Sequence, residues 1–372
     1  MATSIWEHFS IVPDPRVERT QLHKLEDILV IVICGVICGA ENWVDLAAFG
    51  RAKEGWLRTF LELPNGIPSH DTFGRVFAAL DVHAFERAFQ SWIRALAGSS
   101  AGKLIAIDGK TLRRSLDRAS GKAAIHLVSA WVHENHAVFG QLAVDGKSNE
   151  ITAIPQLLAL LDLRGATVTI DAMGCQKEIA QKVVDGGGQY VLAVKGNQET
   201  LHEDIRLFLD DAIEHNFRGI EHDVYEQTEK GHGRLETRKC WTTGQIDWLR
   251  QRHDWPGLQS IAVVEGRRQI GEQGSTERRY FISSLPGRTA QRIGQAVRNH
   301  WTVENELHWS LDLCFGEDQS RARIGHGAEN LSRVRRLALT LLKQETTAKI
   351  GIKAKRLLAG WDEHYLLRVL RI

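Results

Sequence analysis

A chain of 372 residues has room for two or three domains and a large hydrophobic core. Hydrophobic residues make up 43% of it and charged residues 25%, which is typical of a folded, soluble protein. The formal net charge is only +1, which argues against a protein that grips nucleic acid over its whole surface. Any binding to DNA must therefore be regional.

The charge is unevenly distributed along the sequence. From Gln319 to the C-terminus there are twelve Lys and Arg against four Asp and Glu, whereas the stretch from Glu199 to Glu229 is acidic. Blocks of opposite sign suit a protein with one nucleic-acid face. A solvated charged helix fits the basic C-terminal stretch equally well.

The cysteines and the apolar segments indicate a reduced protein of the cytoplasm. The five cysteines form no CxxC pair and no even framework. The N-terminus has no signal-peptide pattern. The apolar run from Ile28 to Ala40 has 13 residues, and crossing a bilayer takes roughly 20. We expect this run to be a buried helix, and no membrane contact.

Residues 1–97 have the pattern of a small helical domain. Apolar residues recur at helical spacing from Leu22 to Val32, and Ser69 is placed to cap a helix that follows the turn at 64–68. With Arg75 on that capped helix, the arrangement could be a helix-turn-helix DNA reader. A helical bundle that only supports the next domain is an equal alternative.

Residues 98–318 have an α/β pattern. Three strands are expected at 104–107, 125–132 and 137–144, followed by a helix, a strand at 167–170, a helix and a strand at 190–194. This order is that of an RNase H-like core, although a generic doubly wound sheet remains an alternative. A partly β insertion is expected at about 198–279, then a strand at 280–285 and one long helix over 289–315. Residues 319–372 are expected to form a basic helical C-terminal region.

Two aspartates are expected to terminate apolar strands, Asp108 in IAIDGK and Asp171 in TIDAMGCQ. Open α/β sheets place their ligands at the carboxyl ends of strands. An aspartate there is costly to bury without a partner, and a divalent metal is a common solution. Taken singly, either residue could instead be a cap of a turn or helix.

A third acid, needed to hold two metal ions, is expected on the helix over 289–315. Glu304 lies on the apolar stripe of that helix, which makes it the preferred candidate ahead of Glu306, Asp312 and Glu317. Three carboxylates favour Mg²⁺ or Mn²⁺. Two such ions can activate a water or a 3′-hydroxyl and stabilise the leaving oxygen of a phosphoryl transfer.

Several long motifs resemble those of bacterial insertion-sequence DDE transposases, in the ISAs-type branch that contains the H-repeat-associated proteins. They are IAIDGKTLRRS, KSNEITAIPQLL, TIDAMGCQKEIA, YVLAVKGNQ, GHGRLETR and VRNHWTVENELHWSLDLCFGED. The resemblance runs essentially end to end, and includes DPRVERTQLHKLEDIL and GIPSHDTFGRVF. It implies an RNase H-like fold on which Asp108, Asp171 and Glu304 are the catalytic, metal-binding triad.

The resemblance also implies the partners and the DNA contacts. The partners are double-stranded DNA, as terminal inverted repeats and target, and a second copy of the chain when DNA is bound. Lys147 and Glu150 are interpreted as structural or as residues that contact the metal ligands. Trp301 could stack on a base or be a core aromatic. Related enzymes carry a Tyr and an Arg before the catalytic Glu and a Lys after it. In this chain Arg298 and His300 are the nearby basic residues before Glu304, with Val297 in place of the Tyr, and Leu311 stands in place of the Lys. The predicted DNA-binding residues are Lys110, Lys195, Arg234, Arg298, His300, Trp301 and Asn305.

Three functions are compatible with the sequence. The first is a transposase that cuts the ends of its element and inserts them elsewhere. The second is a metal-dependent nuclease that no longer transposes. The third, a DNA-binding protein without catalysis, is disfavoured because all three acids are present.

Overall fold

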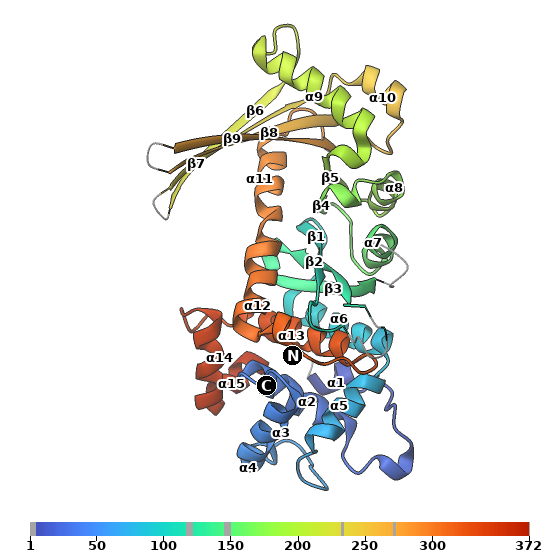
Figure 1. Ribbon diagram of the computed structural model, residues 1–372, viewed down its shortest axis with the longest axis vertical. Helices are drawn as coiled ribbons and strands as arrows, with labels where there is room; N and C mark the ends of the chain where they lie inside the picture. Colours follow the sequence, from blue (N-terminus) through green and yellow to red (C-terminus); the bar gives the residue numbers. More distant parts are fainter. Residues whose placement is uncertain are drawn as a thin grey trace. The chain divides into compact units, whose positions relative to one another are not determined.

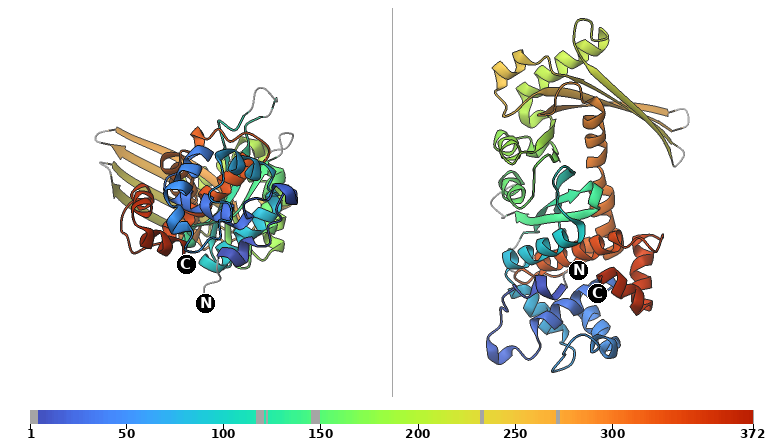
Figure 2. Two further views of the ribbon diagram at one scale, coloured as in Figure 1. Left: turned by 90° about the horizontal axis from the view of Figure 1, so that it is seen from below. Right: turned by 180° about the vertical axis from the view of Figure 1, so that it is seen from behind.

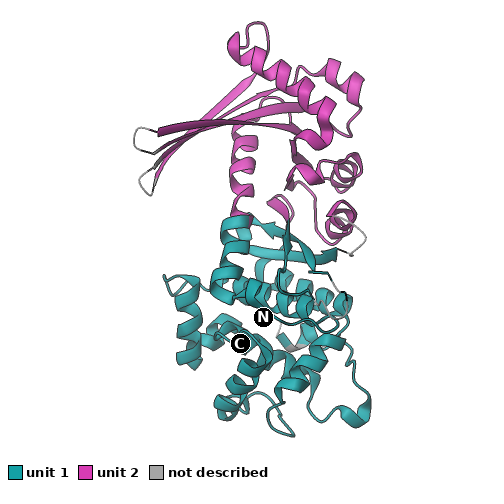
Figure 3. Ribbon diagram, in the orientation of Figure 1, with its two compact units in different colours: residues 1–99, 109–147, 304–372 teal, residues 100–108, 148–303 magenta. Residues whose placement is uncertain are grey.

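The computed structural model describes residues 5–116, 121, 123–144, 150–231, 234–270 and 273–371. The chain forms two compact units (Figure 3). Unit 1 consists of Met1–Ser99, Gly109–Lys147 and Glu304–Ile372, and unit 2 of Ser100–Asp108 and Ser148–Val303. Packing thus divides the chain differently from the three consecutive segments expected, because the C-terminal helices pack on the N-terminal ones.

Unit 1 is mainly helical and is built around α13 (Gly327–Gln344) (Figure 1). This helix contacts α2, α5, α6 and strand β3, and every residue from Gly327 to Leu342 is buried. The other helices of unit 1 are α1 (Ile5–Phe9), α2 (Leu25–Ile37), α3 (Trp43–Ala52), α4 (Glu54–Leu57), α5 (His70–Ala79), α6 (Val82–Ala97), α12 (Trp309–Phe315), α14 (Ile352–Trp361) and α15 (Glu363–Leu370).

The N-terminal helices begin where the sequence places cap residues. Asn42, Ser69 and Asp81 each accept a backbone N–H in the first turn of α3, α5 and α6, which confirms the predicted cap at Ser69. Nearly all of α2 is buried, so the apolar run is a core helix as expected. Among the described residues, no helix is both long enough and apolar enough to span a bilayer.

The strands of unit 1 are β2 (His126–Val132) and β3 (Ala137–Val144), an antiparallel hairpin. The hairpin turn contains η2 (His133–Asn135) and His136 in the left-handed conformation. The end of β1 (Leu104–Thr111) lies beside β2, so the strand order is β3-β2-β1. The hairpin is antiparallel, whereas the strands of a generic doubly wound sheet are mostly parallel.

Unit 2 contains a mixed sheet in the order β1-β4-β5-β9-β8-β7-β6. The first three strands are parallel, and the rest pair antiparallel. Strands β6 to β9 form a twisted antiparallel layer that extends past α11 (Figure 2). The bounds are β4 (Thr167–Ile170), β5 (Gln189–Val194), β6 (Asp223–Gly231), β7 (Arg234–Thr243), β8 (Ser260–Ile270), β9 (Gln273–Ser283), α7 (Glu150–Ala159), α8 (Lys177–Asp185), α9 (Glu199–Glu214), α10 (Asp247–His253) and α11 (Ala290–His300).

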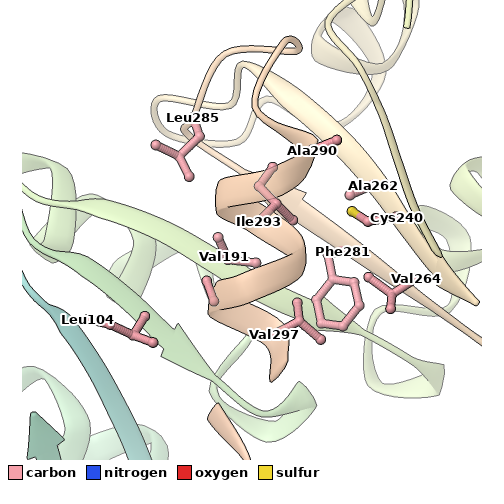
Figure 4. Packing of buried hydrophobic residues seen from close by; sticks show 11 residues of the cluster. Leu104, Val191, Cys240, Ala262, Val264, Phe281, Leu285, Ala290, Ile293 and Val297 are labelled. Carbon is pink, nitrogen blue, oxygen red and sulfur yellow. The ribbon is translucent and has the colours of Figure 1, made fainter. Parts of the chain in front are cut away.

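The core beside this sheet is formed by the apolar stripe of α11 (Figure 4). Ile293 and Val297, four residues apart on the helix, pack with Val191, Val264 and Phe281 from three strands. This packing fixes α11 against one face of the sheet, the face that also carries the candidate site.

Two expectations from the sequence are wrong. Strand β1 continues to Thr111, so Asp108 lies within a strand and not at its end. The long helix over 289–315 is three pieces, α11, a π-helix over Val303–His308, and α12. A π-helix has more residues per turn than an α-helix, so it rotates the side chains that follow relative to an α-helical pattern.

Candidate active site

Asp108 and Asp171 occupy matching positions on two neighbouring strands of unit 2. Strands β1 and β4 are parallel, and Ile107 pairs with Ile170 at the end of their register. Asp108 is the next residue of β1, and Asp171 directly follows the end of β4. The pairing therefore brings the two predicted ligands to adjacent positions in the sheet.

The alternation of side chains along a strand places both aspartates on the face covered by α11. On β1 this face carries Leu104, which packs in the cluster around α11. On β4 it carries Thr167 and Thr169, whose hydroxyls bond Arg292 and His300 of α11. Asp108 follows Leu104 by four residues and Asp171 follows Thr169 by two, so both aspartates point to this same face.

The carboxylate of Asp171 is set in a polar turn. Its Oδ1 accepts the backbone N–H of Met173 at 3.1 Å and of Gly174 at 3.3 Å, so it also caps η3 (Ala172–Gly174). Burial and the negative charge of Glu150 raise its pKa, whereas the two N–H groups and Lys195 oppose the rise. A cation beside Asp171 would offset both causes that disfavour the ionised form.

The charges of Lys195 and Glu150 both act on the carboxylate of Asp171. Lys195 is exposed at the end of β5, the strand next to β4, and suits the predicted role of a phosphate contact. Glu150 begins α7, and its negative charge acts on Asp171. Its interpretation as a structural residue or as one that contacts the metal ligands stays a prediction. Lys147 lies outside the described residues.

His300, a predicted DNA contact, is held against the sheet. Its Nδ1 and the Thr169 hydroxyl are 3.0 Å apart. Burial, with the nearby charge of Arg279, lowers the pKa of His300 to about 4. The ring is therefore neutral at pH 7, so it can form a hydrogen bond with a phosphate but no ion pair.

Trp301 and Arg298, two further predicted contacts, lie at the end of α11. The Trp301 ring is 47% exposed, so the alternative of a core aromatic is wrong. The guanidinium of Arg279 lies 5.8 Å from its centroid, a cation–π contact that no sequence signal indicated. Arg298 donates to Glu229 at 3.2 Å, which in turn accepts from Arg238.

Glu304 begins the third segment of unit 1, Glu304–Ile372, and belongs to the π-helix. It is exposed, so the expectation that it lies on a buried stripe is wrong, because the π-helix changes which residues face inward. Val303 and Leu307 are the buried residues on either side of it. Two predicted ligands therefore belong to unit 2 and one to unit 1.

The remaining predicted contacts have different surroundings. Asn305 is exposed, next to Glu304. Lys110 is buried and forms ion pairs with Asp312 and with Glu317, so contact with a phosphate would require these pairs to open. The side chain of Arg234 lies outside the described part of the chain.

The donor set of Asp108 and Asp171 suits a hard divalent cation, because carboxylate oxygens are the ligands that Mg²⁺ and Mn²⁺ prefer. In the described ranges, no three His, Cys, Asp or Glu side chains are gathered closely enough to hold an ion. A metal site at Asp108 and Asp171 would therefore require a further ligand.

Comparison with protein families identifies the family of this chain. Residues 99–341 match the model described as "Transposase DDE domain", which includes both aspartates and Glu304, and residues 6–93 match the model described as "DDE_Tnp_1-associated". The chain belongs to the DDE transposase family. The boundary between the two matched regions falls between residues 93 and 99, close to the predicted end of the N-terminal domain.

Relatives of this DDE transposase chain confirm its resemblance to the H-repeat-associated branch. The chain is 42% identical to the "H repeat-associated putative transposase YhhI" of Escherichia coli K12, with 98% of this chain and 97% of that one covered. It is 51% identical to the "Uncharacterized protein in dhlA 3'region" of Xanthobacter autotrophicus, over 74% of this chain and 92% of that one. Among solved structures, a piggyBac transposase synaptic complex with hairpin DNA is similar at TM-score 0.40 and 11% identity, covering 100% of this chain and 77% of that one.

Proposed function

We propose that this chain is a DNA transposase that cuts and joins DNA strands in a metal-dependent reaction at the ends of an insertion sequence. The single observation that carries the proposal is the alignment of Asp108 and Asp171 on adjacent parallel strands, on the face where α11 packs. Family membership adds the class of reaction. We place the activity in the bacterial cytoplasm, at the nucleoid.

The proposed fold of the catalytic core is RNase H-like. The strand order β3-β2-β1-β4-β5, with an antiparallel hairpin followed by parallel strands, supports this assignment. Strands β6 to β8 then form the inserted β-rich part, between α9 and β9. The helix α11 returns the chain to the sheet before Glu304.

Glu304 is the proposed third ligand. Chain connectivity supports it, because Glu304 follows by four residues His300, whose ring is hydrogen-bonded to Thr169 on the strand that carries Asp171. The π-helix is a second support, since such segments are frequently found at functional sites. Its exposed carboxylate is accessible to a metal ion.

Two Mg²⁺ or Mn²⁺ ions, when bound, would supply activation of the attacking hydroxyl and stabilisation of the leaving oxygen. The residues of the chain hold and orient the reacting groups. Asp108 and Asp171 offer aligned carboxylates, and the backbone N–H groups of Met173 and Gly174 fix the rotamer of Asp171. Lys195 beside them is suited to a DNA phosphate.

The proposed DNA contacts are Lys195, Arg234, Arg298, Trp301 and Asn305, with the neutral ring of His300 as a hydrogen-bonding group. The exposed Trp301 ring, flanked by Arg279, offers a stacking surface for an unpaired base. Because both ends of an element must be held together, we expect two copies of the chain on the DNA.

The test is cleavage of a labelled duplex that carries the ends flanking the gene, with Mg²⁺ or Mn²⁺. Wild type is compared with Asp108→Asn and Glu304→Gln, after each has been shown to be folded and to bind the duplex. Loss of a metal ligand removes several kcal/mol of transition-state stabilisation, so we expect cleavage to fall by about 10³-fold in each variant.

The other outcomes separate the alternatives. Binding by all three proteins without any cleavage would leave a DNA-binding protein and end the catalytic proposal. Cleavage without strand joining would identify a nuclease that no longer transposes. Equal cutting by wild type and Glu304→Gln would exclude Glu304 as a ligand.

A further inference from the structure

A buried ionic network in unit 1 joins two motifs that the sequence analysis treated separately. Lys110 of the IAIDGK motif has a side chain only 9% exposed, yet it carries an ammonium group. It pairs with Asp312, and its Nζ lies 3.4 Å from Oε2 of Glu317. Both acids belong to the second motif, LDLCFGED. A lysine in such surroundings is costly to bury unless it is paired.

Glu317 extends the network to the central helix of unit 1. Its side chain is fully buried, and its Oε1 accepts from Arg336 at 2.9 Å and from the Ser332 hydroxyl at 2.8 Å, both on α13. Burial alone would raise the pKa of Glu317, but Arg336 and Lys110 lower it to about 2. The Lys110 ammonium is therefore linked to the buried helix α13 through the Glu317 carboxylate, which is charged at pH 7.

Two exposed contacts run parallel to this network. The Arg113 guanidinium lies 3.3 Å from Asp318, and Arg323 donates to the backbone carbonyl of Arg114 at 3.1 Å. The segment 110–114 is thus connected at four points to the segment 312–323. Only the Lys110 contacts are shielded from water, because the Arg113 side chain is 81% exposed. The buried contacts should be the ones that fix the geometry.

The position of this network along the chain gives it a function. Lys110 follows Asp108 by two residues, and Asp312 follows Glu304 by eight, within the helical run made by the π-helix and α12. We propose that Lys110, Asp312 and Glu317 are positioning residues, which hold together in unit 1 the two segments that emerge from the metal ligands Asp108 and Glu304. The inference rests on the proposed function, and it replaces the predicted phosphate contact of Lys110.

The experiment measures Mn²⁺ binding by the full-length chain without DNA, from the electron paramagnetic resonance signal of free Mn²⁺. The variants are Lys110→Met, Asp312→Asn and the double variant, with Asp108→Asn as the variant that lacks a ligand. Arg113→Gln is the matched control, because it removes an exposed ion pair between the same two segments. Near-ultraviolet circular dichroism and a thermal melt establish that each protein is folded.

Removing residues that orient metal ligands typically weakens metal binding by 10- to 100-fold. We expect Lys110→Met and Asp312→Asn each to raise the Kd for Mn²⁺ by about tenfold. The double variant should do no more than Lys110→Met alone, because Lys110→Met already removes the ion pair with Asp312. Arg113→Gln should bind as wild type does. A role in stability alone would lower the melting temperature and leave the Kd unchanged.

Two results would overturn the inference, and they are distinguishable. If wild type binds Mn²⁺, Asp108→Asn does not, and folded Lys110→Met and Asp312→Asn bind normally, the positioning role is wrong and the metal site stands. If wild type binds no Mn²⁺ at all, the metal site itself is wrong and the positioning role is lost with it.

Discussion

Replacing Arg333 with Met tests whether the buried charges of α13 hold unit 1 together. The Arg333 side chain is 2% exposed, and its guanidinium donates to Glu86 and to Glu329 at 2.7 Å each. Removing one partner of a buried ion pair costs about 3–5 kcal/mol. Glu86 keeps donors on its other oxygen, from Gln90 and the backbone of Gln141, which places the expected loss near the lower end, about 3 kcal/mol.

The assay is urea denaturation at pH 7 followed by far-ultraviolet circular dichroism, with the loss read from the shift of the midpoint. Arg58→Met is the control, because it breaks an ion pair with Glu54 whose side chains are 45% and 37% exposed, and such pairs contribute about 1 kcal/mol or less. The double variant Arg333→Met with Glu86→Gln should recover part of the loss, because it removes one orphaned carboxylate. If Arg333→Met costs no more than Arg58→Met, the reasoning from buried charge is refuted.

Two further predictions concern titration at the candidate site. Since burial and Glu150 raise the pKa of Asp171, its ionised form destabilises the metal-free protein at pH 7, and this cost disappears as the pH falls below the ordinary aspartate pKa. Asp171→Asn should therefore raise the melting temperature at pH 7 but not near pH 3.5, and equal effects at both values would contradict it. The pKa of His300 is lowered to about 4, so its ring signals in nuclear magnetic resonance should stay constant from pH 8 to 5 and move only below that, whereas a midpoint near 6.5 would show a solvated ring.

The sequence predicted the sheet of the catalytic region well. Strands built of apolar runs were placed to within a residue or two at β2, β3, β4 and β5, because their ends coincide with changes in polarity. Asp108 and Asp171 could be paired from the sequence, since each follows a short apolar run and the carboxyl ends of parallel strands share an edge. The structure agrees, because the register of β1 with β4 pairs Ile107 with Ile170, the residues directly before the two aspartates.

The surroundings of these acids could not be predicted in the same way. The π-helix at Glu304 leaves no mark in a pattern of apolar residues, so a stripe drawn with 3.6 residues per turn assigns Glu304 to the wrong side. Lys110 and Asp312 are 202 residues apart, and their pairing depends on how β1, α12 and η6 (Glu317–Gln319) pack. The sequence alone does not show whether Lys110, which follows Asp108, contacts a phosphate or a buried carboxylate.

In the basic C-terminal region, a count of charged residues overestimates the positive charge that is exposed on the surface. Of its twelve Lys and Arg residues, five are buried: Arg333, Arg335, Arg336, Lys355 and Arg356. Several of them neutralise carboxylates from elsewhere in the chain, such as Glu86 and Glu317, and are unavailable to phosphates. The excess of positive charge after residue 319 is therefore partly internal to unit 1, and neither a nucleic-acid face nor a solvated helix describes α13. The basic side chains that remain exposed, such as Lys195, whose charge acts on Asp171, are the ones accessible to a phosphate.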